Sequence, residues 1–151
     1  MQQMNKLFNT SFESGLRALL VLYTVKPINM TIDRIAAYDF ITLYSSSFGI
    51  TENNLHGNSI FNFSELASKR AGCNEGIKEF VLSGLISINH TENGITYGLT
   101  NLSLQFVKSL TSDYTNRYLS INGLVHKEYK DLSDEELLQR INEKAIQELR
   151  R

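Results

Sequence analysis

The stretch between Phe63 and Leu99 constrains the fold of this chain more than any other. Ser64 is placed to cap a first helix over residues 65–70, because its side chain can accept a hydrogen bond from a free backbone N–H of the first turn. Gly72 then offers the permissive backbone that a turn needs. A second helix is expected over residues 74–83, where apolar residues recur at spacings of three and four. This part of the chain therefore predicts two helices joined by a turn.

Two alternating segments follow and predict a β-hairpin. Gly84 should end the second helix, since glycine is favoured just past helix ends. Apolar residues then alternate with polar ones on either side of Asn93 and Gly94, a pair typical of a tight turn. The alternating positions are Ile86, Ile88, Ile95, Tyr97 and Leu99. A helix-turn-helix followed by a hairpin is the core of a winged helix-turn-helix. We therefore expect a mainly α fold with a small β-hairpin (α+β), flanking helices and a C-terminal helical extension.

A strongly apolar helix is expected near the N-terminus. Thr10 and Glu13 have the spacing of a capping box, so the helix should begin near Ser11. It should end by Lys26, because Pro27 restricts the residue before it. The helix is apolar nearly all round, which indicates either the central helix of the domain or a face shared with another subunit.

A second helix, capped by Thr31, is expected over residues 32–46. Asp33 lies in its first turn, and a second acidic residue, Asp39, lies between Tyr38 and Phe40 and could be half-buried. Such an aspartate is either solvated or paired with an arginine.

The other segments are a loop and three helices. Residues 45–62 are rich in Ser, Asn and Gly and predict a long ordered loop with a contact role. Helices are expected over residues 102–110 and 112–126, and Ser133 with Glu136 forms a capping box that starts the last helix. The apolar stripe of that last helix consists of Leu138, Ile141, Ala145 and Leu149.

The length of 151 residues fits one domain with a helical extension. We expect a winged-helix domain with its N-terminal helices over residues 1–125, and a linker with an amphipathic helix over residues 126–151. A single cysteine excludes an internal disulfide and fits a reducing compartment. The chain shows neither a signal layout nor a long apolar run, so a cytoplasmic protein without a membrane partner is expected.

The charges argue against a conventional DNA reader. Fifteen basic and sixteen acidic side chains give a net charge of -1, whereas a duplex-binding surface needs basic residues to neutralise phosphates. The second predicted helix carries Lys78 between two glutamates, Glu75 and Glu79. Weak or composite nucleic-acid binding stays open, with Lys69, Arg70 and Lys78 as the candidate residues.

No residue set predicts catalysis. The three histidines, His56, His90 and His126, are far apart in the sequence, and none has a partner at metal-ligand spacing. Cys73 starts the second predicted helix, where a thiolate could be stabilised, but a buried cysteine is the better interpretation. We therefore expect no enzyme, and neither a cofactor nor a metal.

Several short motifs follow one another along about residues 8–125. They are FNTSFESGLRALLVL from Phe8, Arg34 with Asp39-Phe40, Leu43 and Ser45, Asn54-Leu55-His56-Gly57, Ser64-Glu65-Leu66 with Lys69-Arg70, Gly84-Leu85-Ile86, Gly94-Ile95-Thr96-Tyr97, and Tyr114 with Leu119. In this order they resemble the middle component of the prokaryotic ABC three-component systems.

The resemblance implies a small winged-helix protein encoded between an effector and an ATPase of the structural-maintenance-of-chromosomes (SMC) or Rad50 type. One such group is the Lamassu anti-phage defence systems. There the small subunit bridges the coiled-coil ATPase and the effector, often a nuclease, which is held inactive until foreign DNA is sensed. ATP and metal would belong to these partners, and DNA would be met only within the complex. The alternative is a DNA-binding transcriptional regulator of the winged-helix class.

Under the adaptor interpretation, candidate partner contacts come from three segments. They are Phe12, Leu16 and Arg17 in the first helix, Leu55 and His56 in the long loop, and Tyr118, Leu138, Ile141 and Leu149 in the C-terminal segment.

Overall fold

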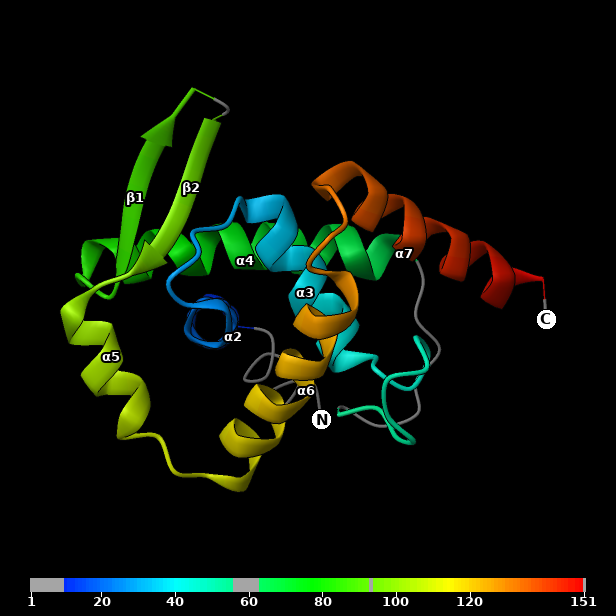
Figure 1. Ribbon diagram of the computed structural model, residues 1–151, viewed down its shortest axis with the longest axis horizontal. Coiled ribbons are helices and arrows are strands. Elements are labelled where there is room, and N and C mark those ends of the chain that lie inside the picture. Colours follow the sequence, from blue (N-terminus) through cyan, green and yellow to red (C-terminus); the bar gives the residue numbers. More distant parts are fainter. Residues whose placement is uncertain (1–9, 56–62, 93, 151) are drawn as a thin grey trace.

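A computed structural model describes residues 10–55, 63–92 and 94–150, except the side chains of 63–65 and 149. The described residues form six helices and one two-stranded hairpin (Figure 1). In chain order these are α2 (Ser11–Val25), α3 (Ile32–Leu43), α4 (Phe63–Leu82), β1 (Ile86–Thr91), β2 (Gly94–Leu99), α5 (Asn101–Lys108), α6 (Asp113–Tyr129) and α7 (Asp134–Leu149). The mainly helical α+β class expected from the sequence is confirmed.

Hydroxyl side chains set the start of five helices. In each case a serine or threonine oxygen accepts a hydrogen bond from the backbone N–H three residues on, which would otherwise have no partner. The capping residues are Thr10, Thr31, Thr100, Ser112 and Ser133. The predicted capping box of Ser133 and Glu136 is present, with both reciprocal bonds.

The first apolar helix is the central helix of the fold. Residues 18–22, five in a row, are at most 1% exposed. α2 packs against α4, α6 and α3 and also contacts β2 and α5, and Figure 1 shows it almost end-on between these elements. Because it has neighbours on nearly every side, it needs apolar residues nearly all round. The central-helix interpretation is confirmed.

The predicted turn at Gly72 is wrong, because residues 63–82 form one continuous helix, α4. Gly72 and Gly76 lie one helical turn apart and both face α2. A Cβ atom at Gly76 would overlap the main chain of Gly15 and Ser11, and one at Gly72 would lie 3.0 Å from the Oγ of Ser14. These glycines therefore serve close packing between two helices and do not break the helix.

The hairpin matches its prediction. Gly84 follows α4 with a positive φ of 78°, which favours glycine, and β1 pairs antiparallel with β2. Ile86 lies opposite Leu99, and Thr91 lies opposite Gly94 next to the turn. The hairpin is extended by one isolated bridge outside its two strands, between Met30 and Tyr97.

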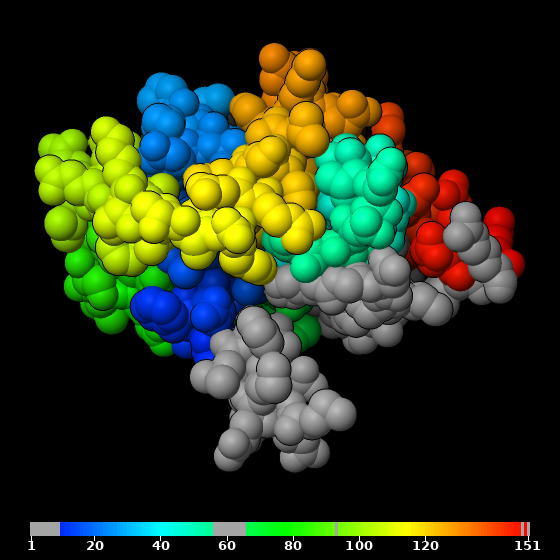
Figure 2. Space-filling model, turned by 90° about the horizontal axis from the view of Figure 1, so that it is seen from below, coloured from blue at the N-terminus to red at the C-terminus, as the bar shows by residue number. Residues whose placement is uncertain are grey.

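The C-terminal elements differ in detail from their prediction. α6 continues to Tyr129, so the expected boundary between residues 125 and 126 falls inside a helix. On α7 the fully buried line consists of Leu137, Ile141 and Ala145, while Leu138 is half-buried. Leu137, Ile141 and Ala145 belong to the same core, and α7 packs against α3. In the view from below, α5 and α7 lie on opposite flanks of the molecule (Figure 2).

Candidate functional site

A buried polar cluster joins three helices at the centre of the molecule. Arg17 of α2 donates from Nε to Oδ1 of Asp39 on α3 over 3.0 Å, and both side chains are at most 3% exposed. The hydroxyl of Tyr118 on α6 donates to the same carboxylate oxygen over 2.5 Å. Nη2 of Arg17 also donates to Ser14 over 3.4 Å. Of the two alternatives left open for Asp39, solvation or pairing with an arginine, the structure shows the pairing, and the partner is Arg17.

The pKa values of Arg17 and Tyr118 in this cluster, and of nearby Cys73, are all raised. Burial lowers the pKa of Arg17, but the charge and hydrogen bond of Asp39, together with Tyr118 and Tyr114, outweigh burial and raise it. Burial raises the pKa of Tyr118 well above 10, and the negative charge of Asp39 raises it further. Burial likewise raises the pKa of nearby Cys73 to about 12. Near neutral pH the arginine therefore stays charged, while Tyr118 and Cys73 stay neutral. The buried-cysteine interpretation is confirmed, because Cys73 is 1% exposed.

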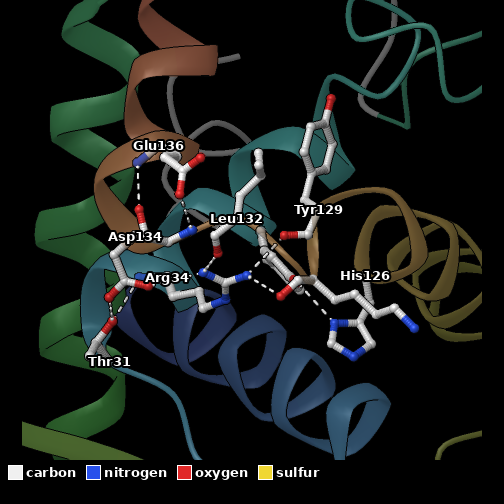
Figure 3. A network of polar contacts seen from close by, with 10 residues as sticks. Thr31, Arg34, His126, Tyr129, Leu132, Asp134 and Glu136 are labelled. Carbon is white, nitrogen blue, oxygen red and sulfur yellow. Dashed lines mark hydrogen bonds and ion pairs between the residues drawn. The ribbon is translucent and has the colours of Figure 1, made fainter.

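A second polar node attaches the start of α7 and the end of α6 to α3 (Figure 3). The guanidinium of Arg34 donates to three main-chain carbonyls at this corner, those of Tyr129 (3.0 Å), Lys130 (3.3 Å) and Leu132 (2.7 Å). It also pairs with Asp134 at 3.1 Å. Carbonyls at the end of a helix have no partner within the helix, so a cation there is favourable.

Thr31, which caps the start of α3, and Tyr38 of α3 complete this node. The hydroxyl of Thr31 donates to Oδ2 of Asp134 over 2.6 Å, so the carboxylate is held from two sides. The hydroxyl of Tyr38 lies 2.9 Å from Nδ1 of His126. Burial lowers the pKa of His126, and the positive charges of Arg34 and Lys130 lower it further. His126 is therefore mostly neutral at pH 7 and acts here as a hydrogen-bonding side chain.

Residues 10–55, 63–92 and 94–150 contain no group of three or more His, Cys, Asp or Glu side chains that could hold a metal ion. Among the same residues, each helix is too short or too polar to cross a membrane. The two polar clusters consist of ion pairs and hydrogen bonds between helices. They fix the helices, and so the surfaces that the helices carry, relative to one another.

Comparison with models of known protein families gives a match that covers nearly the full length of the chain. A family model described as "ABC-three component (ABC-3C) system Middle Component 2" matches residues 7–151. The chain belongs to this family. Neither a curated protein nor a solved structure matches it. As a middle component of a multi-component system, this protein has partner subunits. The exposed residues are therefore the candidates for contacts with those subunits.

The candidate contacts on α2 of this middle component differ in exposure. Phe12 is 54% exposed and lies against the ring of Phe80 on α4, with centroids 5.7 Å apart. Leu16 is half-buried against the core. Arg17 is 2% exposed and already paired with Asp39, so in this structure its side chain does not reach the surface.

The other candidate contacts are also mostly inside. Tyr118 and Ile141 belong to the core, and Leu55 and Leu138 are half-buried. The side chains of His56 and Leu149 lie outside the described residues. The structure thus brings Arg17 and Tyr118 together at one carboxylate. Of the remaining candidates, Phe12 and Leu16 lie on α2, while Leu138 and Ile141 lie on α7. Their binding to a partner stays a prediction.

The three nucleic-acid candidates lie on α4. Arg70 is exposed and pairs with Asp33 at 2.6 Å, and exposed Lys78 pairs with Glu75 at 3.4 Å. Lys69 is half-buried. The charges of Arg70 and Lys78 are therefore each balanced by an adjacent carboxylate.

Sequence reasoning missed the role of Arg34 and the exposed apolar surface outside the listed candidates. Arg34 carried no signal of its own, because its acceptors are main-chain carbonyls about 95 residues away. A groove of about 470 Å³ lies between the end of α2 and the start of α5, lined mostly by apolar residues such as Pro27, Ile28 and Leu99. Two isoleucines of the hairpin, Ile88 and Ile95, are also exposed. Their alternation was visible in the sequence, but their exposure was not.

Proposed function

We propose that this middle component is a non-enzymatic adaptor in an anti-phage or anti-plasmid defence complex. It would bridge an ABC ATPase of the SMC or Rad50 type and an effector, such as a nuclease, and help keep the effector inactive until foreign DNA is sensed. Membership in the middle component 2 family carries this proposal. ATP and metal would be bound by the partners, and DNA would be met only within the assembled complex.

The distribution of exposed apolar residues supports a bridging role. The hairpin presents Ile88 and Ile95, whereas α7 presents Ile146. α5, next to the hairpin in the chain, and α7 lie on opposite flanks (Figure 2). Between them, the Arg17–Asp39–Tyr118 cluster and the Arg34 node fix the helices relative to one another. A body with contact surfaces on separate sides suits a protein that binds two partners at once.

The order of elements supports a winged-helix interpretation with a different assignment from the one read in the sequence. α2, the Met30 bridge, α3, α4 and the hairpin follow each other as helix, strand, helix, helix and wing. In this assignment α3 and α4 form the helix-turn-helix, and α4 takes the place of the recognition helix. This order favours the alternative function, a DNA-binding regulator, while the paired charges on α4 favour the adaptor.

Co-purification of all three components tests the adaptor. We expect the products of the two neighbouring genes to associate with each other only when this chain is present. Ile146→Lys should weaken binding of one partner about tenfold or more, because it places a charge in an exposed apolar contact on α7. Leu124→Lys, at a similarly exposed leucine of α6, is the matched control.

Point substitutions are preferable to removal of α7 in this test. Deletion after Ser133 would take Leu137, Ile141 and Ala145 out of the core and so would also affect folding. Association of the two partners without this chain would contradict the adaptor proposal.

Duplex binding by the isolated chain separates the two functions. A regulator should bind duplex DNA with an affinity that falls steeply as salt rises, because counterions are released at each phosphate contact. The adaptor proposal predicts no measurable binding at 150 mM salt.

A further inference from the structure

The bridge between Met30 and Tyr97 fixes which way the main-chain groups of the hairpin point. The N–H of Met30 donates to the carbonyl of Tyr97 over 2.9 Å, and the N–H of Tyr97 donates back over 2.8 Å. The main-chain groups of Tyr97 therefore point away from β1, toward Met30. In an antiparallel pair, positions that face the partner strand alternate with positions that face outward.

The register of the hairpin then shows which main-chain groups of β1 point outward. Ile88 lies opposite Tyr97, and His90 lies opposite Ile95. The N–H and carbonyl groups of Ile88 and His90 therefore point outward, at the edge of β1 that faces away from β2. In the described part of the chain, neither residue makes a backbone hydrogen bond on that side. β1 thus offers two donors and two acceptors along a free edge.

This edge lacks the usual protection against pairing. Proteins normally guard an edge strand with a lysine, a proline, a bulge or a covering element. β1 has the sequence ISINHT and runs without a bulge in its register. Ile88 and Ile95 are 45% and 47% exposed and lie on the same face of the hairpin, so an added strand would also gain apolar contact. The acidic side chain nearest to this edge in the sequence is Glu92, in the turn.

We propose that β1 binds an extended segment of a partner subunit, which adds to the hairpin as a further strand. The segment is uncharged over about four to six residues, because neither β1 nor β2 offers a lysine, arginine, aspartate or glutamate for a charged side chain to pair with. Every second residue is apolar, so that one face packs against Ile88 and Ile95. This inference rests on the proposed adaptor function, since it names one of the surfaces that the adaptor uses.

Proline substitution distinguishes edge binding from other contacts. In Ile88→Pro, the ring removes an N–H that points outward, so the pairing of β1 with β2 is kept while the free edge loses a donor. Ile88→Val keeps the N–H and the strand preference and is the matched control. With the purified products of the two neighbouring genes as probes, we expect Ile88→Pro to weaken binding of one of them at least tenfold. Ile88→Val should change it less than twofold.

Amide hydrogen exchange provides the direct measurement. On complex formation the amides of Ile88 and His90 should become protected at least tenfold, while a thermal melt shows that Ile88→Pro is folded. A complex in which these two amides exchange as in the free chain would overturn the inference and leave the adaptor function intact. If neither probe binds, both proposals fail. Protection that rises with the concentration of the isolated chain would instead identify a second copy as the occupant and overturn the inference.

Discussion

At the scale of single residues, the main feature is a charge pair that water does not reach. Removing two charges from water costs several kcal/mol, and only good geometry with extra hydrogen bonds offsets this cost. The carboxylate of Asp39 receives bonds from both Arg17 and Tyr118, and Arg17 reaches Ser14 as well. The pair therefore depends on the correct placement of α2, α3 and α6 together.

Asp39→Asn should be strongly destabilising. The substitution leaves the guanidinium of Arg17 buried without a countercharge, which costs about 3–5 kcal/mol of unfolding free energy. Urea unfolding followed by circular dichroism measures this loss. Asp33→Asn is the control, because it breaks the exposed pair with Arg70 and should cost less than about 1 kcal/mol. Equal effects of the two substitutions would show that the buried pair has no special role.

The buried thiol should make stability depend on alkaline pH. Burial raises the pKa of Cys73 to about 12, from an ordinary value near 9, so above pH 9 the unfolded chain loses a proton that the folded chain keeps. Stability is therefore complete below pH 9 and falls as pH rises toward 12, with a slope of up to about 1.4 kcal/mol per pH unit from this group.

Comparison with Cys73→Ala isolates this contribution. Between pH 9 and 10 the unfolding free energy of the variant should fall less steeply than that of the parent chain, whatever its absolute stability. The tyrosines Tyr114 and Tyr118, whose pKa values are also raised by burial, act at higher pH in both proteins. Identical slopes would mean that the thiol is not shielded from water in the folded state.

At the scale of elements, α2 and α4 approach so closely that backbone meets backbone. Gly15 and Gly76 make this possible, and Gly72 allows Ser14 to fit beside it. The capped starts of α2, α3 and α7, the hairpin and the apolar character of α2 could be predicted because each depends on neighbours in the sequence. The role of Gly72 could not, since a glycine allows both a turn and a close helix contact, and only the position of α2 decides between them.

Gly76→Ala should separate the two helices. The added methyl group overlaps the main chain of Gly15 and Ser11, and neither can move without shifting α2. We expect a loss of about 1–3 kcal/mol, seen as a lower midpoint in thermal unfolding. Gly123→Ala, on α6 with nothing within 4 Å of the new Cβ, should instead gain up to about 1 kcal/mol. A neutral effect at both positions would contradict the close-contact interpretation.

Polar side chains that pair over long distances in the chain are the second feature that could not be predicted from the sequence. Arg17 and Asp39 each lie beside apolar residues on helices that also carry charged residues in their first turns, so the sequence alone does not show that these two form a buried pair. The sequence predicts Arg17 as a partner contact because, on a helix that is apolar nearly all round, the pattern does not tell an inner face from an outer one. Tyr118 lies 79 residues from Asp39, and the sequence around either residue does not predict the hydrogen bond between them.

At the scale of the whole molecule, charge is balanced both in total and locally on α4. The net charge is -1, and Arg70 and Lys78 each have a carboxylate within 4 Å. A surface of this kind has little attraction for a polyanion, whereas exposed isoleucines on the hairpin and on α7 suit protein contacts.

Lys78→Glu tests this balance in the assembled system. Lys78 forms an exposed pair with Glu75, so the change should alter stability by less than about 1 kcal/mol. Under the adaptor proposal, co-purification of the three components and protection of cells against phage, scored as plating efficiency, should both stay within about twofold of the parent. A complex that still assembles but no longer protects cells would point to a DNA contact at α4.

The Arg34 node has a consequence for how this corner of the protein can vary. Three of its bonds go to carbonyl oxygens, which every amino acid supplies, so they place no demand on the side chains of Tyr129, Lys130 and Leu132. The ion pair and hydrogen bond to Asp134 do require the identities of Arg34, Thr31 and Asp134. The contact between Tyr38 and His126 likewise requires those two side chains. The turn between α6 and α7 can therefore change its surface chemistry to suit a different partner while its anchor to α3 is kept.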